Sequence, residues 1–212
     1  SLISTGSDEE ESNAICDSIK AEIKLHKSSF KDFAVLYRTN AQSRMIEQTM
    51  MKEGLPYNIV GGTKFYDRKE IKDVIAYLTI VCNPNDNIAL KRIINFPVRG
   101  IGEKSINIFN ELAAEKGISL FESLKFCREI KLRGKQQDSI ENFYQSINKF
   151  HDLLDTLDCK ELLRTLLEEF NIENYYKNNP VEQERYDNIQ ELKSSIDRFA
   201  DNSNGNLKDF LQ

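Results

Sequence analysis

Tyr37 and Arg38 are a pair of neighbouring residues whose side chains could bind a nucleotide. They stand at the end of an apolar stretch that begins at Phe33 and is typical of a buried strand. Ligands of open α/β sheets gather at such strand ends. A tyrosine ring can stack on a base, and a guanidinium group can meet phosphate oxygens with two hydrogen bonds. Taken alone, the pair also fits a core tyrosine beside a surface arginine.

A second segment that could bind a ligand runs from Pro97 to Ser105. Gly100 and Gly102 flank one apolar residue, which predicts a tight hairpin whose backbone can approach a partner closely. The helix predicted to follow offers free amides to an anion, and Arg99 and Lys104 flank the hairpin. A helix-hairpin-helix module contacts the DNA phosphate backbone in this way without reading bases. A plain turn is the alternative, and the flanking cations together with the preceding predicted helix favour the DNA contact.

The charge distribution supports a polyanion site in the same region. The chain has 212 residues and a net charge of -5. Residues 91–135 nevertheless carry ten Lys or Arg residues against five Asp or Glu residues, whereas residues 136–212 carry eight against sixteen. A basic segment inside an acidic chain is expected of a protein that binds nucleic acid. The acidic last third is interpreted as a solvated helical surface.

The first 90 residues alternate between predicted strands and helices. Short strands are expected at residues 2–4, 33–37 and 57–60. The helices between them begin at a capping box at Ser7 and at Asn40. Such β-α-β-α-β alternation predicts a small, incomplete parallel α/β lobe.

The remainder of the chain is predicted to be helical. A helix opens near Asp67–Glu70 and ends at Pro84, and another runs from Asp86 to Asn95. Apolar residues then recur at helical spacing along residues 143–157, 162–170 and 186–199. The fold class expected is therefore mainly α, with the α/β lobe followed by an all-helical lobe that contains helix-hairpin-helix-like elements.

Composition excludes several classes of protein. No apolar run approaches the roughly 20 residues of a membrane span, and no secretory leader opens the chain. The cysteines are far apart, without a C-x-x-C pair, so neither a disulfide framework nor a metal site is predicted; they are Cys16, Cys82, Cys127 and Cys159. We expect a cytoplasmic protein without a membrane partner.

Three long segments resemble UvrD/PcrA/Rep-type superfamily-one DNA helicases. They are Y-R-T-N-A-Q-S-R from Tyr37, G-G-T-K-F-Y-D-R-K-E-I-K-D-V-I-A-Y-L from Gly61, and R-I-I-N-F-P-V-R-G-I-G from Arg92. The resemblance is close from Phe33 to Gly102 and looser to Gln212. It implies that residues 1–90 are the first part of a RecA-like motor domain, 2A. Residues 91–212 would then be most of the helical DNA-binding domain 2B.

The resemblance also implies a role for individual residues. Tyr37 matches the tyrosine that packs on adenine, and Arg38 matches the catalytic arginine that reaches the γ-phosphate from across the cleft. The DNA contact would comprise Arg99, Gly100, Ile101, Gly102, Lys104 and Ser105, with Lys135 in a fainter second hairpin at Leu132–Lys135. Structural roles are expected for Asn40, Gln42, Arg68 and Glu70.

Several helicase motifs are absent from these 212 residues. There is no G-x-x-x-x-G-K-[ST] loop to hold the β- and γ-phosphates, and no predicted strand carries a D-E-x-x Walker B motif for Mg²⁺. The acidic run that begins at Asp8 is interpreted as the start of a helix. The resemblance therefore implies a fragment of a longer helicase. ATP and Mg²⁺ would act in the full-length parent, and the fragment alone is expected to be inactive, to bind no cofactor and to leave Tyr37 substantially exposed. Its partners would be duplex and junction DNA and the remaining domains of the same polypeptide.

Two other classes of function stay open. A standalone helix-hairpin-helix adaptor would bind DNA without sequence preference and would not need Tyr37 and Arg38. A helical protein-interaction module would use the acidic last third and show no salt-dependent DNA binding.

Overall fold

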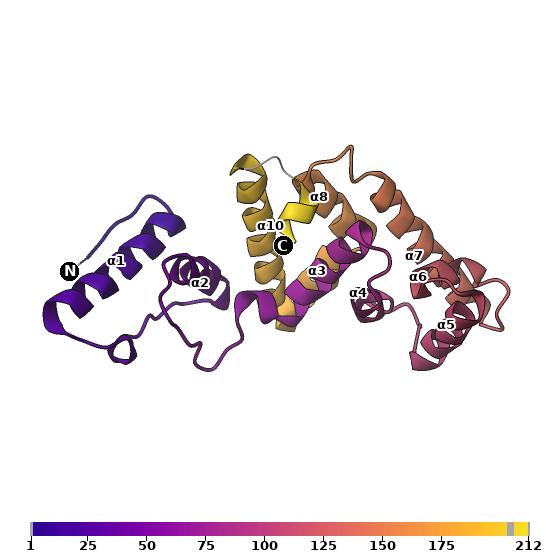
Figure 1. The fold of residues 1–212 in the computed structure, drawn as a ribbon, viewed down its shortest axis with the longest axis horizontal. Coiled ribbons are helices and arrows are strands. Elements are labelled where there is room, and N and C mark those ends of the chain that lie inside the picture. Colours follow the sequence, from indigo (N-terminus) through magenta and orange to yellow (C-terminus); the bar gives the residue numbers. More distant parts are fainter. Residues whose placement is uncertain (1, 203–205, 212) are drawn as a thin grey trace. The chain divides into compact units, whose positions relative to one another are not determined.

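The computed structural model describes residues 2–202 and 206–211 and is mainly helical (Figure 1). The chain divides into two compact units, Ser1–Arg68 and Lys69–Gln212, each with its own internal contacts. The sequence placed the division after residue 90, between two domains of the helicase family. The structure instead groups the helices of residues 69–93 with the second unit, and the assignment of 1–90 and 91–212 to family domains stays a prediction.

The first unit is built on two helices. Helix α1 spans Asp8–His26 and α2 spans Ser43–Lys52, and short 3-10 turns lie at Phe30–Asp32, Asn40–Gln42 and Phe65–Asp67. The hydroxyl of Ser7 accepts the Glu10 N–H at 3.2 Å, which confirms the predicted start of α1. Four acidic residues lie in the first turn of α1, where their negative charges interact favourably with the positive end of the helix dipole.

The predicted parallel α/β lobe is wrong, because the described residues include no strand. The stretch that was expected to be a buried strand instead has side chains that alternate between the core and solvent over residues 33–36. Phe33 and Val35 pack against the core of α1 and α2, whereas Leu36 is 92% exposed. Val60 is likewise exposed. The inward side chains of this extended segment are therefore buried against helices, and its backbone does not form the hydrogen-bond ladder that defines a sheet.

The second unit is entirely helical in its described part, and no helix of the described chain is long and apolar enough to cross a membrane. Its helices are α3 (Lys69–Cys82), α4 (Asn87–Ile93), α5 (Glu103–Lys116), α6 (Leu120–Ser123), α7 (Gly134–Asp152), α8 (Cys159–Glu169), α9 (Ile172–Lys177), α10 (Gln183–Asn202) and α11 (Leu207–Phe210). Two 3-10 turns complete it, at Leu124–Phe126 and Pro180–Glu182. The predicted stripe at residues 186–199 lies on α10, and that at 162–170 lies on α8 and its C-cap. The stripe at 143–157 lies on α7 only as far as Asp152, because the helix ends there and Leu154 and Leu157 follow in a turn.

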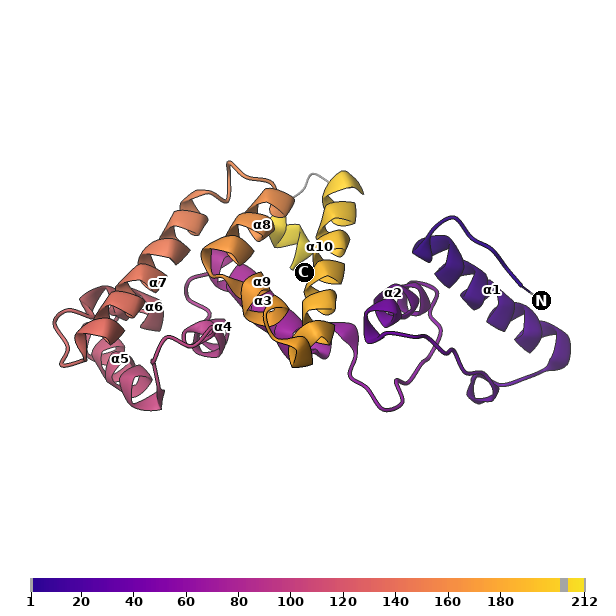
Figure 2. The same ribbon diagram turned by 180° about the vertical axis from the view of Figure 1, so that it is seen from behind.

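Helix α3 organises the second unit. It contacts α4, α7, α10 and α11, and the two views show it beside α10 (Figures 1 and 2). Its buried Glu70 accepts a hydrogen bond from the Asn188 side chain of α10 at 2.6 Å. Its buried Asp73 pairs with Arg92 of α4 at 2.7 Å. Burial raises the pKa of Asp73, and the nearby Arg92 opposes this shift.

Candidate nucleic-acid interface

The predicted hairpin lies in the loop between α4 and α5. Gly100 has a φ of +74°, a left-handed conformation that favours glycine. The side-chain oxygen of Asn95 accepts the N–H of Arg99 at 2.9 Å and the N–H of Ile101 at 3.0 Å. The Ile101 side chain is fully buried and anchors the loop in the core. The hairpin is therefore a fixed structure, braced from inside by Asn95, with Gly100 exposed.

The helix after the hairpin begins at an open surface. Gly102 precedes α5 with φ -95° and ψ 178°, an extended conformation, and no heavy atom lies within 4 Å of the position a Cβ would occupy. Lys104 is exposed at the second helical position. Ser105 is buried, and its N–H donates to the Gly102 carbonyl at 3.0 Å. An anion can thus approach the backbone here, with Lys104 as its cation and with Ser105 inside the protein.

Arg99 is used inside the protein. Its guanidinium donates to the carbonyls of Ile93 and Phe96 at 2.9 and 2.7 Å and to the Tyr77 hydroxyl at 2.6 Å. Burial raises the pKa of Tyr77 to about 12, so this residue keeps its proton, and its hydroxyl donates to the Phe96 carbonyl. The guanidinium that the sequence assigned to a phosphate thus closes the end of α4 and holds the hairpin in place.

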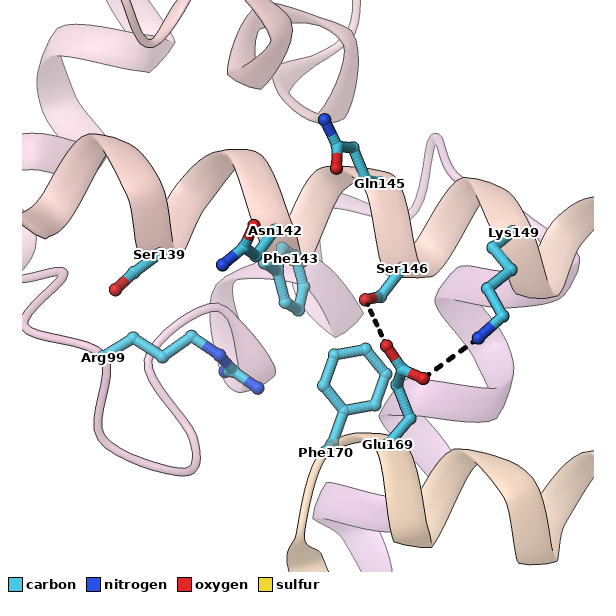
Figure 3. A pocket seen from close by; sticks show the side chains of 9 residues that line it. All are labelled: Arg99, Ser139, Asn142, Phe143, Gln145, Ser146, Lys149, Glu169 and Phe170. Atoms are coloured by element: carbon cyan, nitrogen blue, oxygen red, sulfur yellow. Dashed lines mark hydrogen bonds and ion pairs between the residues drawn. The ribbon is translucent and has the colours of Figure 1, made fainter.

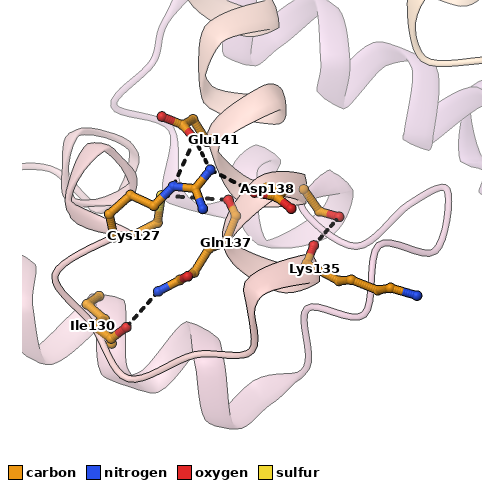
Figure 4. A network of polar contacts seen from close by, with 8 residues as sticks. Cys127, Ile130, Lys135, Gln137, Asp138 and Glu141 are labelled. Carbon is orange, nitrogen blue, oxygen red and sulfur yellow. Dashed lines mark hydrogen bonds and ion pairs between the residues drawn. The ribbon is translucent and has the colours of Figure 1, made fainter.

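A second turn leads into α7 and carries Lys135. Arg128 fixes the preceding loop by pairing with Glu141 at 2.5 Å and with Asp138 at 2.7 Å, both on α7. The Gln137 amide adds a hydrogen bond to the Ile130 carbonyl at 3.1 Å. Figure 4 shows these contacts on one side of the turn and the exposed Lys135 side chain pointing away from them. Lys135 is free to meet an anion in solution.

Gln136 joins the two turns. Its side-chain amide nitrogen donates to the Gly100 carbonyl at 2.5 Å, across 36 positions of sequence. Its side-chain oxygen accepts the Arg133 N–H of its own turn at 3.4 Å. The structure therefore brings the hairpin at Gly100 and the turn at Lys135 together. The sequence analysis missed both Gln136 and Asn95, because neither residue type carries the charge or spacing that marks a site.

A pocket of about 660 Å³ opens beside Arg99, along α7 (Figure 3). Phe143 and Phe170 lie under the guanidinium, with ring centres 5.0 and 5.4 Å from its carbon. Glu169 accepts hydrogen bonds from Ser146 at 2.9 Å and Lys149 at 3.0 Å. The Lys149 ammonium and the Ser146 hydroxyl together hold the pKa of Glu169 below its ordinary value. The rest of the lining is neutral and polar: Ser139, Asn142 and Gln145.

Tyr37 and Arg38 lie in the first unit. Tyr37 is partly buried, so the expectation of a substantially exposed ring is wrong, and it lies outside the buried core cluster. Arg38 is exposed, and within the described residues no carboxylate pairs with its guanidinium. The side-chain oxygen of Gln42 accepts the N–H of Arg38 at 3.0 Å and of Thr39 at 3.1 Å. The backbone of Arg38 is thus held while its side chain can reach an anion.

Residues expected to be structural make internal contacts. Arg68 is buried and donates to the Ser43 hydroxyl at 2.8 Å and to the Thr63 carbonyl at 3.3 Å. Glu70 and Gln42 make the contacts described above. These positions connect segments within one unit.

Sequence comparison gives the family of the chain. The chain belongs to the UvrD-like helicase C-terminal domain family, whose model matches residues 1–212. It is 42% identical over 179 residues to the ATP-dependent DNA helicase PcrA of Bacillus subtilis, covering 84% of this chain and 24% of that relative. It is 40% identical over 194 residues to the ATP-dependent DNA helicase PcrA of Staphylococcus aureus strain Mu50, covering 86% of this chain and 26% of that relative. The chain thus spans about a quarter of the length of these relatives.

Proposed function

We propose that this chain is part of an ATP-dependent DNA helicase and that its second unit contacts duplex DNA without sequence preference. Its family membership and the names of its relatives support the helicase assignment. The observation that carries the DNA contact is the open N-terminus of α5, where exposed Lys104 follows Gly102. A phosphate there would meet backbone N–H groups, the positive end of a helix dipole and an ammonium group.

The contact that we propose differs in detail from the set of residues expected from sequence. Lys104 and Lys135 supply the charges, and the backbone from Gly100 to Gly102 supplies the close approach. Arg99, Ile101 and Ser105 are positioning residues, because their side chains are directed into the protein. In the family's terms, residues 1–90 would belong to domain 2A and residues 91–212 to domain 2B.

A salt titration of the 212-residue chain with a short duplex tests this proposal. The logarithm of the binding constant should fall linearly with the logarithm of salt concentration. Lys104→Glu should reduce the steepness of that fall by about 0.9 for each phosphate that the variant no longer neutralises. Lys177→Glu is the matched control, since it makes the same charge change at an exposed position on α9.

Two outcomes would contradict the DNA contact. Equal effects of Lys104→Glu and Lys177→Glu would mean that only net charge matters. Binding that is absent or independent of salt would favour a helical protein-interaction module that uses the acidic last third.

We further propose that the first unit supplies one wall of the ATP site in the complete helicase. The exposed guanidinium of Arg38, held at its backbone by Gln42, supports a contact to the γ-phosphate, and the partly exposed ring of Tyr37 supports a contact to adenine. We assign the Mg²⁺ ligands to other parts of the polypeptide, because these 212 residues contain no G-x-x-x-x-G-K-[ST] loop, whose Ser or Thr would hold the ion.

Substitution of Arg38 tests this wall in the complete helicase polypeptide. Arg38→Ala should lower ATP turnover by roughly 10³-fold and leave DNA binding intact, as expected for an arginine finger. Arg38→Lys should restore little, because an ammonium does not reproduce the planar fork. Lys31→Ala, at an exposed cation of the same unit, is the control and should retain normal turnover. Near-normal turnover in Arg38→Ala would refute the assignment.

A further inference from the structure

Each of the two turns of the candidate interface presents a lysine at the same position of the helix that follows it. Lys104 is the second residue of α5, and Lys135 is the second residue of α7. Both lysines are exposed, and no ion pair involves either ammonium in the described part of the chain. Each helix is long enough to present a full set of N-terminal amides. The sequence separates the two lysines by about thirty residues, so only the fold brings their turns together.

The contact between the turns depends on one side chain. The amide of Gln136 uses both of its ends, since the nitrogen donates to Gly100 in the first turn and the oxygen accepts from Arg133 in the second. The stem of the Gln136 side chain also lies beside the hairpin, because a Cβ placed on Gly100 would lie 4.0 Å from the Gln136 Cγ. The bond to Gly100 joins the two turns, and the bond to Arg133, within the second turn, holds the Gln136 side chain against its own backbone.

We propose that Gln136 is a positioning residue that joins the two turns into one bivalent phosphate-binding unit, so that Lys104 and Lys135 bind the same duplex together. This inference rests on the proposed function of the site. Two contacts held in a fixed arrangement bind a duplex more tightly than two contacts on independent loops. The reason is that the second loop then loses less conformational entropy on binding. Gln136 has no charge, and its effect on binding acts through the lysines.

The proposal predicts an effect on DNA binding that is separable from folding. Gly100 and Arg133 are both exposed, so water can replace Gln136 at their backbone groups. Gln136→Met keeps the length of the side chain and removes both hydrogen bonds. The variant should therefore fold with the helix content and denaturation midpoint of the wild type, while the second turn loses its registry with the first.

The experiment measures the salt dependence of duplex binding by the 212-residue chain and its variants. Lys104→Ala and Lys135→Ala should each reduce the slope by about 0.9. Gln136→Met should reduce it by a similar amount, although no charge is removed. Adding Lys135→Ala to Gln136→Met should then change the slope little further. Gln145→Met makes the same substitution at an exposed glutamine of α7 and should bind as the wild type does.

The results that would overturn the inference are distinct from those that would overturn the function. A wild-type slope in Gln136→Met, together with reduced slopes in both lysine variants, means that the turns bind independently. Additive effects of Gln136→Met and Lys135→Ala also overturn it. A wild-type chain without salt-dependent binding overturns the proposed function itself. If Gln136→Met does not fold, Gln136→Asn decides the question, since its amide is one methylene too short to reach Gly100.

Discussion

Asn95→Ala removes the side-chain oxygen that braces the hairpin from inside. That oxygen accepts two backbone N–H groups, at 2.9 Å from Arg99 and at 3.0 Å from Ile101. A hydrogen bond of this kind contributes about 1 kcal/mol net, and a buried donor left without a partner costs about 1–3 kcal/mol. Ile101 is fully buried, so the loss of a partner for its N–H should cost about 1–3 kcal/mol. The loss of the hydrogen bond from the Arg99 N–H should cost about 1 kcal/mol. The expected reduction in the free energy of unfolding is therefore about 2–4 kcal/mol.

Chemical denaturation followed by circular dichroism measures this reduction, and a duplex titration measures its effect on binding. Asn95→Asp is the matched control, because a carboxylate still accepts both N–H groups. The aspartate variant should stay within about 1 kcal/mol of the wild type and yet bind duplex more weakly, since its charge repels phosphate. Asn95→Ala should be impaired in both assays. Stability of Asn95→Ala within about 0.5 kcal/mol of the wild type would refute the bracing role.

The remaining predictions concern the two glycines and Arg99. Gly100→Ala should lose about 1–2 kcal/mol in a denaturation experiment, because alanine is strained at φ +74°, whereas Gly102→Ala should be nearly neutral in its extended and open position. Equal stabilities of these two variants would contradict the hairpin geometry. Arg99→Lys keeps the charge but should lose at least about 2 kcal/mol of stability, since an ammonium cannot reach the same carbonyls and hydroxyl. A direct phosphate contact would instead tolerate lysine, with stability unchanged.

The helices were predictable because their signals are local. The cap at Ser7, the start of α5 at Glu103 and the apolar stripes of α7, α8 and α10 are all encoded within a few residues of the element they define. The proline at position 84 follows the end of α3 at Cys82 in the same way. Such signals are reliable because each depends on residues that are close in the sequence.

The strands could not be predicted reliably because a strand is defined by its partner. The alternation of Phe33 and Val35 with exposed Leu36 is the pattern of a half-buried strand, and the structure uses it to cover α1 and α2. Side-chain burial and backbone pairing give the same sequence pattern. The sequence was read as a buried strand, so it predicted neither the exposed side of this segment nor the absence of backbone pairing.

The tight turn at Gly100 was predicted from the sequence, whereas the contacts of its side chains were not, and its contact with DNA stays a prediction. The glycines and the basic composition pointed to the hairpin. The sequence does not distinguish an arginine that contacts phosphate from one that closes the end of a helix, as Arg99 does. Asn95 and Gln136 act through backbone groups of the hairpin, and Gln136 reaches one 36 positions away in sequence. Contacts of a side chain with a distant backbone leave no spacing in the sequence to detect.

The bond between Glu70 and Asn188 has a consequence for the order in which the protein forms on the ribosome. These residues are 118 positions apart, so α3 and both turns of the candidate interface are synthesised well before the helix that covers the Glu70 carboxylate. At roughly 5–20 residues per second, the interval is about 6–24 s. During that time the carboxylate is hydrated and the α3 surface is uncovered. Both turns of the candidate interface are therefore synthesised before α10, and the second unit is complete only once α10 has packed on α3.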